Sequence, residues 1–510
     1  MPPNADLATM LTQTQTAMNI MWVLIASFLI MLMQAGFAMV ETGLTRRKNV
    51  AHTMAMNFMV YSIGTLGFWA LGFGLQMGGV GTLATLGGDS SLSQELVVSA
   101  FGHEHGVLGL SGFMLPPSMY TPAVATIFLF QLMFMATACI IPTGALAERW
   151  RFSAFMLFSL AISTLIYPIY ANWVWGGGFL SGLGKNFGLG HGHVDFAGSS
   201  VVHLTGGVIA FVACKMLGPR HGKYGADGNV RPIVGHNMPM VVCGTFVLAF
   251  GWFGFNAGST LSALDTRIAV VAVNTMLASA AGAVSACVYT GWRFGKPDLS
   301  MMCNGMLAGL AAITGSCAFV SSFSALAIGA VAGTLVVISA LFVEHTLRID
   351  DPAGAISVHG VNGAWGALAV GLFADGSYGA GINGVEGGVR GLFFGDSGQL
   401  IAALLAIGTN IVYVGLSATL CFWLVNKLVG NRVSIADEVS GLDVPELGLE
   451  GYSLDLPNSP SRPSLIPGAI TNPMPVGLTA VPQSGSIVPA GAFSSPVAPS
   501  FGAFKTYHGT

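Results

Sequence analysis

The stretch SSVVHLTGG, residues 199–207, places one histidine, His203, in the middle of an apolar segment. The stretch ISVHGVNG, residues 356–363, does the same with His359. Each stretch lies in the fifth long apolar segment of its half of the chain. An ionisable side chain at bilayer depth is costly, usually faces a cavity, and marks a functional site by default. The two histidines therefore predict a membrane pathway for something that carries a proton.

The composition of the chain supports a membrane location. Of the 510 residues, 53% are hydrophobic and 8% are Asp, Glu, Lys or Arg, whereas soluble domains carry about 25% charged residues. Glycine contributes 70 residues, and small residues let helices approach closely in lipid. The formal net charge of -3 favours no nucleic-acid partner. We therefore expect an all-α polytopic membrane protein whose helices pack tightly.

Eleven apolar segments are long enough to cross a membrane, for which about 20 residues are needed. We place them at roughly 18–42, 50–78, 120–147, 152–174, 198–217, 237–258, 267–292, 301–319, 324–346, 355–373 and 399–427. Lys and Arg gather in alternate loops, and such loops lie on the cytoplasmic side. This asymmetry puts the N-terminus outside and the C-terminus in the cytoplasm.

The spans divide into two halves of five, spans 1–5 and 6–10, followed by a final helix. Because five is odd, the second half is inverted relative to the first, which is the plan of many transporters. The fifth helices of the two halves then run antiparallel. The pseudo-twofold axis of such an inverted repeat brings His203 and His359 together near the midplane.

Four regions follow one another along the chain. Residues 1–17 are a short extracellular or periplasmic N-terminus, and residues 18–432 form the membrane domain. Residues 433–452 are an acidic stretch whose spaced Leu and Val side chains can dock on the basic inner loops. Residues 453–510 are rich in Pro, Ser and Gly and have almost no charge, a composition typical of disorder.

Seven longer motifs also follow one another along the chain. They are MQAGFAMVETGLTRRKN (33–49), GALAERWRFSA (144–154), WVWGGGFL (173–180), DFAGSSVVHLTGG (195–207), GWFGFNAGS (251–259), DDPAGAISVHGVNGAWG (350–366) and RVSIADEVSGLDVPELGLEGY (432–452). In this order they resemble the Amt/Mep/Rh ammonium transporter family, and its Amt branch in particular. The resemblance implies an ammonium transporter or channel rather than an enzyme, without a cofactor, in the plasma or cell inner membrane.

The resemblance also implies partners. Ammonium or ammonia is the substrate, methylammonium is a second candidate substrate, and a lipid bilayer surrounds the protein. Members of the family are trimers, which implies a homotrimer here. The stretch 433–452 resembles the cytoplasmic regulatory tail of the family, which often responds to a PII-type signalling protein.

Three side chains match the outer ammonium site of the family: Phe134, Trp175 and Ser259. A cation over an aromatic face gains about 0.5–2 kcal/mol, and a hydroxyl can accept one of its N–H bonds. Asp195 matches an aspartate that supports this site from behind, and Asp is also a common helix N-cap. Without the resemblance, Trp and Phe in membrane helices are more often packing or interface residues.

The pore residues of the family match four further positions. Phe134 and Phe255 match a stacked pair that closes the pore, and an apolar constriction admits neutral ammonia more readily than a hydrated cation. His203 and His359 match twin histidines, which can share a proton and pass it on or stabilise ammonia. The alternatives are an ordinary packed aromatic pair and structurally satisfied histidines. Thr314, in AAITGSC, aligns with a threonine near the inner pore.

Several features stay outside this picture. The pairs His103/His105 and His191/His193 lie in outer loops and can chelate a metal only if they meet, so we predict no metal site. Glu41, in VETG, is expected at the inner interface with a loop arginine as its partner.

Two other functional classes compete with a transporter. One is an ammonium sensor, or transceptor, that reports through its cytoplasmic tail. The other is a haem protein with histidine ligands, which two closely paired histidines disfavour because they leave no room for iron. The sequence leaves open whether the proton crosses together with ammonia.

Overall fold

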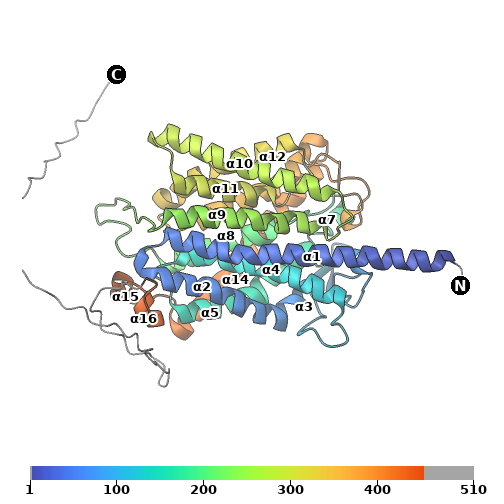
Figure 1. Cartoon of the computed structure of the whole chain (residues 1–510), viewed down its shortest axis with the longest axis horizontal. Coiled ribbons are helices and arrows are strands. Elements are labelled where there is room, and N and C mark those ends of the chain that lie inside the picture. The colour runs from blue at the N-terminus through green and yellow to red at the C-terminus, as the bar shows by residue number, and fades with distance from the viewer. Residues whose placement is uncertain (1–2, 453–510) are drawn as a thin grey trace, which may run out of the picture. The chain divides into compact units, whose positions relative to one another are not determined.

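Long helices packed side by side fill the structure, a computed structural model that describes residues 3–452 (Figure 1). The predicted tail 453–510 lies outside the described residues. The first half of the bundle contains α1 (Pro3–Leu44), α2 (Val50–Gly67), η2 (Phe68–Gly72), α3 (Phe73–Met77), α4 (Pro122–Leu146), α5 (Phe152–Ala161), η4 (Ile162–Ile166), α6 (Tyr167–Trp175), α7 (Leu183–Phe187), η5 (Ser199–Leu204) and α8 (Thr205–Leu217).

The second half contains α9 (Met238–Trp252), η6 (Phe253–Ala257), α10 (Arg267–Phe294), α11 (Leu299–Ile313), α12 (Ser322–Leu341), η8 (Phe342–Thr346), η9 (Ile356–Val361), α13 (Asn362–Phe373) and α14 (Ser397–Val429). Two short helices follow, α15 (Ile435–Ser440) and α16 (Asp443–Leu447). Single 3₁₀ turns occur at Arg47–Asn49, Ala84–Leu86, Gly258–Thr260, Ile382–Gly384 and Leu392–Phe394.

Ten helical segments of the described chain are long and apolar enough to span a membrane, close to the eleven predicted. The remaining predicted span, 301–319, corresponds to α11, which has 15 residues. The α11 helix ends at Ile313, and the buried residues that follow form turns. The protein is therefore a multi-pass membrane protein in which one apolar helix is shorter than hydropathy suggests.

Burial separates central helices from peripheral ones. In the most apolar stretch of α4, 83% of the residues are buried. The corresponding share is 28% in α14 and 33% in α10. Helices α1 and α9 run side by side, where the two halves of the chain meet (Figure 1). Because lipid replaces protein contacts on the outer helices, an exposed apolar face there is expected in a membrane bundle.

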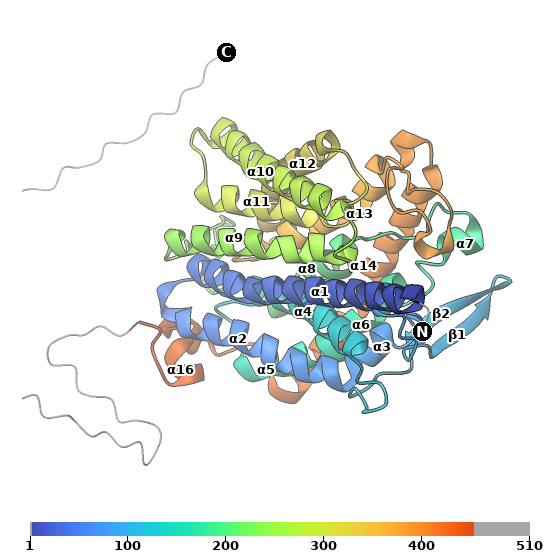
Figure 2. The same cartoon turned by 45° about the vertical axis from the view of Figure 1, so that its right-hand side comes forward.

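The two ends of the bundle differ. At one end lies an antiparallel hairpin of β1 (Glu95–Ala100) and β2 (His103–Gly109), which the sequence analysis did not predict. At the other end lie α15 and α16 (Figure 2). We call these ends the hairpin face and the tail face. The candidate site lies between these two faces and is formed by residues from both halves of the chain.

Candidate functional site

A cavity of about 430 Å³ opens on the hairpin face. Phe134, Trp175 and Ser259, the three residues matched to the outer ammonium site, all line it. The Ser259 hydroxyl donates to the Phe255 carbonyl over 2.8 Å. Its donor is therefore engaged, and its lone pairs remain available to accept a bond from a ligand N–H group.

Trp175 is held at the cavity wall by its indole nitrogen. The indole N–H donates to the Asp195 backbone carbonyl over 2.7 Å. The Trp175 ring meets the Phe134 ring edge-on, with centroids 5.5 Å apart and planes at 83°. The hydrogen bond and the ring contact together hold the Trp175 side chain in one position at the cavity wall.

The Asp195 carboxylate caps the start of η5, the π-helical turn that carries His203. One oxygen accepts the backbone N–H groups of Gly198 and Ser199. The other accepts the Val201 N–H together with the N–H and hydroxyl of Ser200, at 2.7–3.0 Å. Five hydrogen bonds fix the helix entry, as an N-cap does, while the Asp195 carbonyl positions Trp175. Asp195 thus satisfies the free N–H groups at the start of η5, although the N-cap position itself is occupied by Gly198.

Below the cavity, Phe134 and Phe255 close the path. Their rings are stacked with centroids 4.2 Å apart and an interplanar angle of 21°. Both side chains are buried. The next ring along the path is His203, whose centroid lies 5.7 Å from that of Phe255. The predicted aromatic pair and the first histidine are thus in direct succession.

His203 and His359 meet across the two halves of the chain. Their Nδ1 atoms lie 3.1 Å apart and their rings are nearly parallel at 17°. At this distance one Nδ1 must carry a proton and the other must accept it. Both histidines lie in π-helical turns, η5 and η9, and such turns are frequent at functional sites.

Trp252 is a neighbour of His203 that the sequence analysis missed. Its ring stacks on His203 with centroids 5.3 Å apart, and its indole N–H donates to the Thr314 hydroxyl over 2.9 Å. The Thr314 hydroxyl donates in turn to the Leu310 carbonyl. Thr314 is therefore linked to His203 through Trp252. The sequence signal that could have identified Trp252 is its place in the motif GWFGFNAGS, four residues before the end of which Phe255 had already been matched.

On the other side of His359, a small cavity of about 20 Å³ is lined by Glu41 as well as by His359. The expectation that Glu41 lies at the interface with a loop arginine is wrong. Its side chain is buried and accepts hydrogen bonds from Asn57 over 2.8 Å and from Thr143 over 2.6 Å. Because α1 faces the pore at this level, the carboxyl group points into the bundle.

Asp351 caps the second histidine turn as Asp195 caps the first. Its carboxylate accepts the backbone N–H groups of Gly354 over 3.0 Å and Ile356 over 2.7 Å, at the start of η9. Burial raises the pKa of Asp351. Each histidine follows its aspartate by eight residues. This equal spacing is a sequence signal of the repeat, which the sequence analysis did not use.

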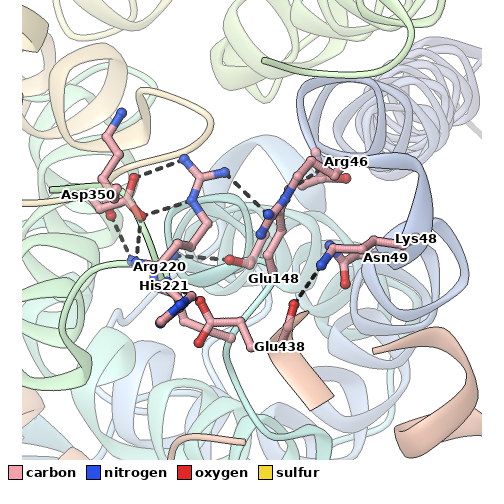
Figure 3. Close-up of polar contacts among 12 residues, drawn as sticks. Arg46, Lys48, Asn49, Glu148, Arg220, His221, Asp350 and Glu438 are labelled. Carbon is pink, nitrogen blue, oxygen red and sulfur yellow. Dashed lines mark hydrogen bonds and ion pairs between the residues drawn. The ribbon is translucent and has the colours of Figure 1, made fainter. Parts of the chain in front are cut away.

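The tail face carries a buried ionic network (Figure 3). Arg220 makes two side-chain hydrogen bonds to Asp350, at 2.8 and 2.9 Å, and lies 3.5 Å from Glu148. Glu148 also pairs with Arg46. Burial alone would raise the pKa of Asp350, but the hydrogen bonds and charges of Arg220 and Arg149 outweigh it and lower that pKa. Four loops, which carry Arg46, Glu148, Arg220 and Asp350, are thereby joined.

The stretch 433–452 docks on this network. Lys48 donates to the Glu438 carbonyl over 2.7 Å (Figure 3). Arg432 pairs with the Glu438 carboxylate at 2.8 Å. The Asp443 carboxylate accepts the backbone N–H of His52 over 2.9 Å. The acidic stretch thus contacts the basic loops through polar groups of Glu438 and Asp443, whereas the sequence analysis expected its spaced Leu and Val side chains to dock there.

Both histidines of the pair His191/His193 have protein partners. His193 bonds the Ser200 hydroxyl at 2.8 Å, and burial lowers the pKa of His193 to about 4 despite the nearby Asp195 charge. His191 bonds the Gly387 carbonyl at 2.9 Å. Across residues 3–452, no group of three or more His, Cys, Asp or Glu side chains is arranged to hold a metal ion.

Comparison with known proteins gives consistent matches along the chain. A family model described as "Ammonium Transporter Family" matches residues 21–452. Ammonium transporter Amt2 of Archaeoglobus fulgidus is 43% identical over 447 residues, which cover 87% of this chain and 90% of that protein. Ammonium transporter Amt1 of Haloferax mediterranei is 36% identical over 446 residues, covering 85% and 79%.

Solved structures match the fold. A structure described as "Sensor Amt Protein" has a TM-score of 0.73 and 35% identity, covering 85% of this chain and 99% of that chain. The crystal structure of Candida albicans Mep2 has a TM-score of 0.68 and 27% identity, covering 82% and 86%. The similarity therefore extends over both halves of the bundle.

Proposed function

Because this chain belongs to the Ammonium Transporter Family, we propose that it moves ammonium across the membrane through the path between Trp175 and Glu41. The observation that carries the proposal is the unbroken succession of rings. The rings of Trp175, Phe134, Phe255, His203 and His359 follow one another with centroid separations of 5.5, 4.2, 5.7 and 5.2 Å. They link the large cavity on the hairpin face to the small one beyond His359.

Capture takes place in the large cavity. Ammonium sits against the faces of Trp175 and Phe134, where the ring quadrupoles attract a cation, and the Ser259 hydroxyl accepts one N–H bond. Asp195 acts without touching the substrate, because its carboxylate is occupied by five protein hydrogen bonds. It is a positioning residue for Trp175 and for η5.

Passage requires loss of a proton. The stacked pair Phe134 and Phe255 offers no polar group to replace the water shell of a cation, so ammonium gives up a proton and neutral ammonia crosses. Ammonia then meets His203 and His359, whose shared Nδ1 contact leaves ring edges to accept or donate a proton. The chain acts here as a channel and not as an enzyme.

The setting of the transporter follows the sequence pattern. The hairpin face lies outside and the tail face lies in the cytoplasm, as the distribution of Lys and Arg favours. The protein lies in the plasma or cell inner membrane as a homotrimer, and methylammonium is an alternative substrate. The stretch 433–452 is a regulatory tail that receives a PII-type protein. The membrane, the homotrimer, the second substrate and the regulator rest on the family resemblance.

A second candidate function is an ammonium sensor. Two observations favour it: the tail is bonded to the loops below the pore through Lys48 and Arg432, and the chain is similar to a structure described as "Sensor Amt Protein". A sensor binds ammonium with little flux, whereas a transporter shows flux.

Purified protein in liposomes tests the proposal. An ammonium pulse is compared with a pH-matched sodium pulse, and both the membrane current and the internal pH are recorded. A sustained current or an internal alkalinisation above that of empty liposomes supports transport. The absence of both responses, together with ammonium binding measured by calorimetry, favours the sensor and contradicts the transporter.

A further inference from the structure

Glu41 is a buried carboxyl group that the path described so far does not use. It lies in α1, its side chain is 4% exposed, and no ion pair reaches it in the described part of the chain. Its hydrogen bonds come from two neutral groups, the Asn57 amide and the Thr143 hydroxyl. A carboxylate without a cation partner at bilayer depth is costly and marks a functional position.

The cavity beside Glu41 fits one small molecule. Its volume of about 20 Å³ exceeds the roughly 10–15 Å³ that one water molecule needs. His359 and Glu41 both line it, together with apolar side chains such as Phe37 and Leu248. A single water or ammonia molecule in this cavity therefore has two titratable neighbours, an imidazole and a carboxyl group.

The same cavity leads toward the tail face. Asn304 and Ala353 line both this cavity and a second one of about 200 Å³. The Asn304 amide donates to the Ala353 carbonyl over 3.3 Å, so the two lining residues that the cavities share contact each other. The second cavity is lined by charged groups, including Lys223, Glu344 and Asp351. Charge is thus accommodated immediately beyond Glu41.

We propose that Glu41 is the inner proton acceptor of this pore. The proposal rests on the proposed transport function and adds a route for the proton that ammonium releases. That proton passes from the His203–His359 pair through one molecule in the small cavity to the Glu41 carboxylate. Ammonia crosses by the same cavity as a neutral molecule, and net charge therefore crosses with it.

The proton balance of the step is simple. An imidazolium at His359 gives its proton to a water in the cavity while that water gives a proton to the Glu41 carboxylate, so the water is unchanged. The carboxyl group then gives its proton to ammonia, which forms ammonium and restores the carboxylate. Asn57 and Thr143 donate to the carboxylate and keep its position in both states.

Few titratable groups face Glu41. His359 lies across the cavity on η9, and Asp351 precedes the same turn. The side chains that α2, α4, α9 and α11 present there are neutral: Asn57, Thr143, Ile141, Leu248, Asn304 and Leu307. A change of charge at Glu41 therefore acts on His359, which shares its cavity, and on Asp351, which precedes the same turn.

The test compares E41Q with wild-type protein in liposomes during an ammonium pulse, with current and internal pH recorded together. Gln keeps the size of the side chain and an oxygen that accepts from Asn57 and Thr143, but it cannot bind the proton. We expect the current to fall by at least about tenfold, at the lower edge of general acid–base effects, while internal alkalinisation rises because ammonia enters alone.

Two further variants control the comparison. E41D keeps a carboxyl group and is expected to regain part of the current. E104Q makes the same chemical change at an exposed position on the hairpin and is expected to leave both signals unchanged. Gel filtration of each variant checks that it is folded.

The outcomes separate the inference from the proposed function. Wild-type alkalinisation without current, an undiminished current in E41Q, or equal loss of both signals in a folded E41Q overturns the proton route and leaves transport standing. No wild-type response of either kind defeats the transport function itself. If E41Q does not fold, infrared difference spectra of wild type and E41D decide. An ammonium-induced carboxyl band that shifts in E41D supports the proposal, and its absence overturns it.

Discussion

The pore and the tail-face network treat charge in opposite ways. From Phe134 to His359 the path is lined by aromatic rings and imidazoles, and the polar groups beside it bond neutral partners such as Thr314. At the tail face, Arg220 and Asp350 are equally buried, but each is paired with an opposite charge. The pore lining from Phe134 to His359 therefore has no ion pair among the described residues, whereas the network consists of ion pairs.

The difference teaches what each region can tolerate. Altering one ring of the neutral path strands no charge, and the geometry of the rings decides which molecule passes. A buried ion pair behaves in the reverse way, because removing one partner leaves the other charged and desolvated. Substitutions should therefore separate flux from stability according to region.

The largest expected effect is on stability, at the network. R220M leaves Asp350 without its cation and Glu148 with one fewer, which should lower the free energy of unfolding by about 3–5 kcal/mol. Chemical denaturation in detergent measures this change. R231M, in the same loop but exposed, should change stability by less than about 0.5 kcal/mol. Equal effects of the two variants would mean that the buried ion pairs of Arg220 contribute no more stability than an exposed arginine does. The contrast between the network and the pore would then fail.

Adding D350N to R220M sharpens this prediction. The double variant removes the stranded carboxylate, so it should regain part of the lost stability, and the cycle gives the coupling energy of the pair. Additive losses would mean that Arg220 stabilises the loops by packing alone.

A smaller effect is expected in the pore, at Thr314. T314V removes the acceptor of the Trp252 indole N–H, which should cost about 1–3 kcal/mol for the buried donor left unpaired. Because Trp252 stacks on His203, ammonium flux should fall more than stability does. Liposome flux and thermal unfolding, measured on one preparation, test this. T164V, whose hydroxyl bonds only its own helix, is the matched control.

The smallest effect is a pH dependence at the hairpin. Burial raises the pKa of Glu95 to about 7, despite a hydrogen bond with Asn172. A carboxyl group with a raised folded pKa contributes stability that is fully present below its unfolded pKa of about 4.5 and is lost as pH rises through about 7. Hydrogen exchange of β1 and β2, corrected for intrinsic rates, should therefore show less protection at pH 8 than at pH 4.

The variant E95Q provides the check on that dependence. Its hairpin protection should be nearly independent of pH over the same range, since the titrating group is gone. If wild type and E95Q show the same slope, the pH dependence arises elsewhere on the hairpin face.

Much of the fold could be predicted because hydropathy is a local signal. The long apolar runs gave the spans, and their division into halves predicted that His203 and His359 approach each other. The limit appears at α11, where Gly and Thr residues after Ile313 end the helix inside an apolar run. The hairpin of β1 and β2 lies in a loop, where hydropathy gives no pairing register.

The site could be predicted only as far as motifs reach. Trp175, Phe134 and Ser259 could be assigned to one site because their motifs were matched one by one. In the structure the three residues line one cavity. The pairing of Arg220 with Asp350 joins residues 130 positions apart, and no sequence periodicity marks such a contact. Glu41 was misplaced because an apolar run does not show which face of a helix is buried.

The central claim is that ammonium crosses through the histidine pair, and one measurement tests it most directly. Wild type and H203A/H359A are placed in liposomes at equal density and given the same ammonium pulse, with current and internal pH recorded together. The account predicts a clear response in wild type and none above empty liposomes in the double variant, which should still elute as folded protein. A wild-type response from the double variant would contradict the account.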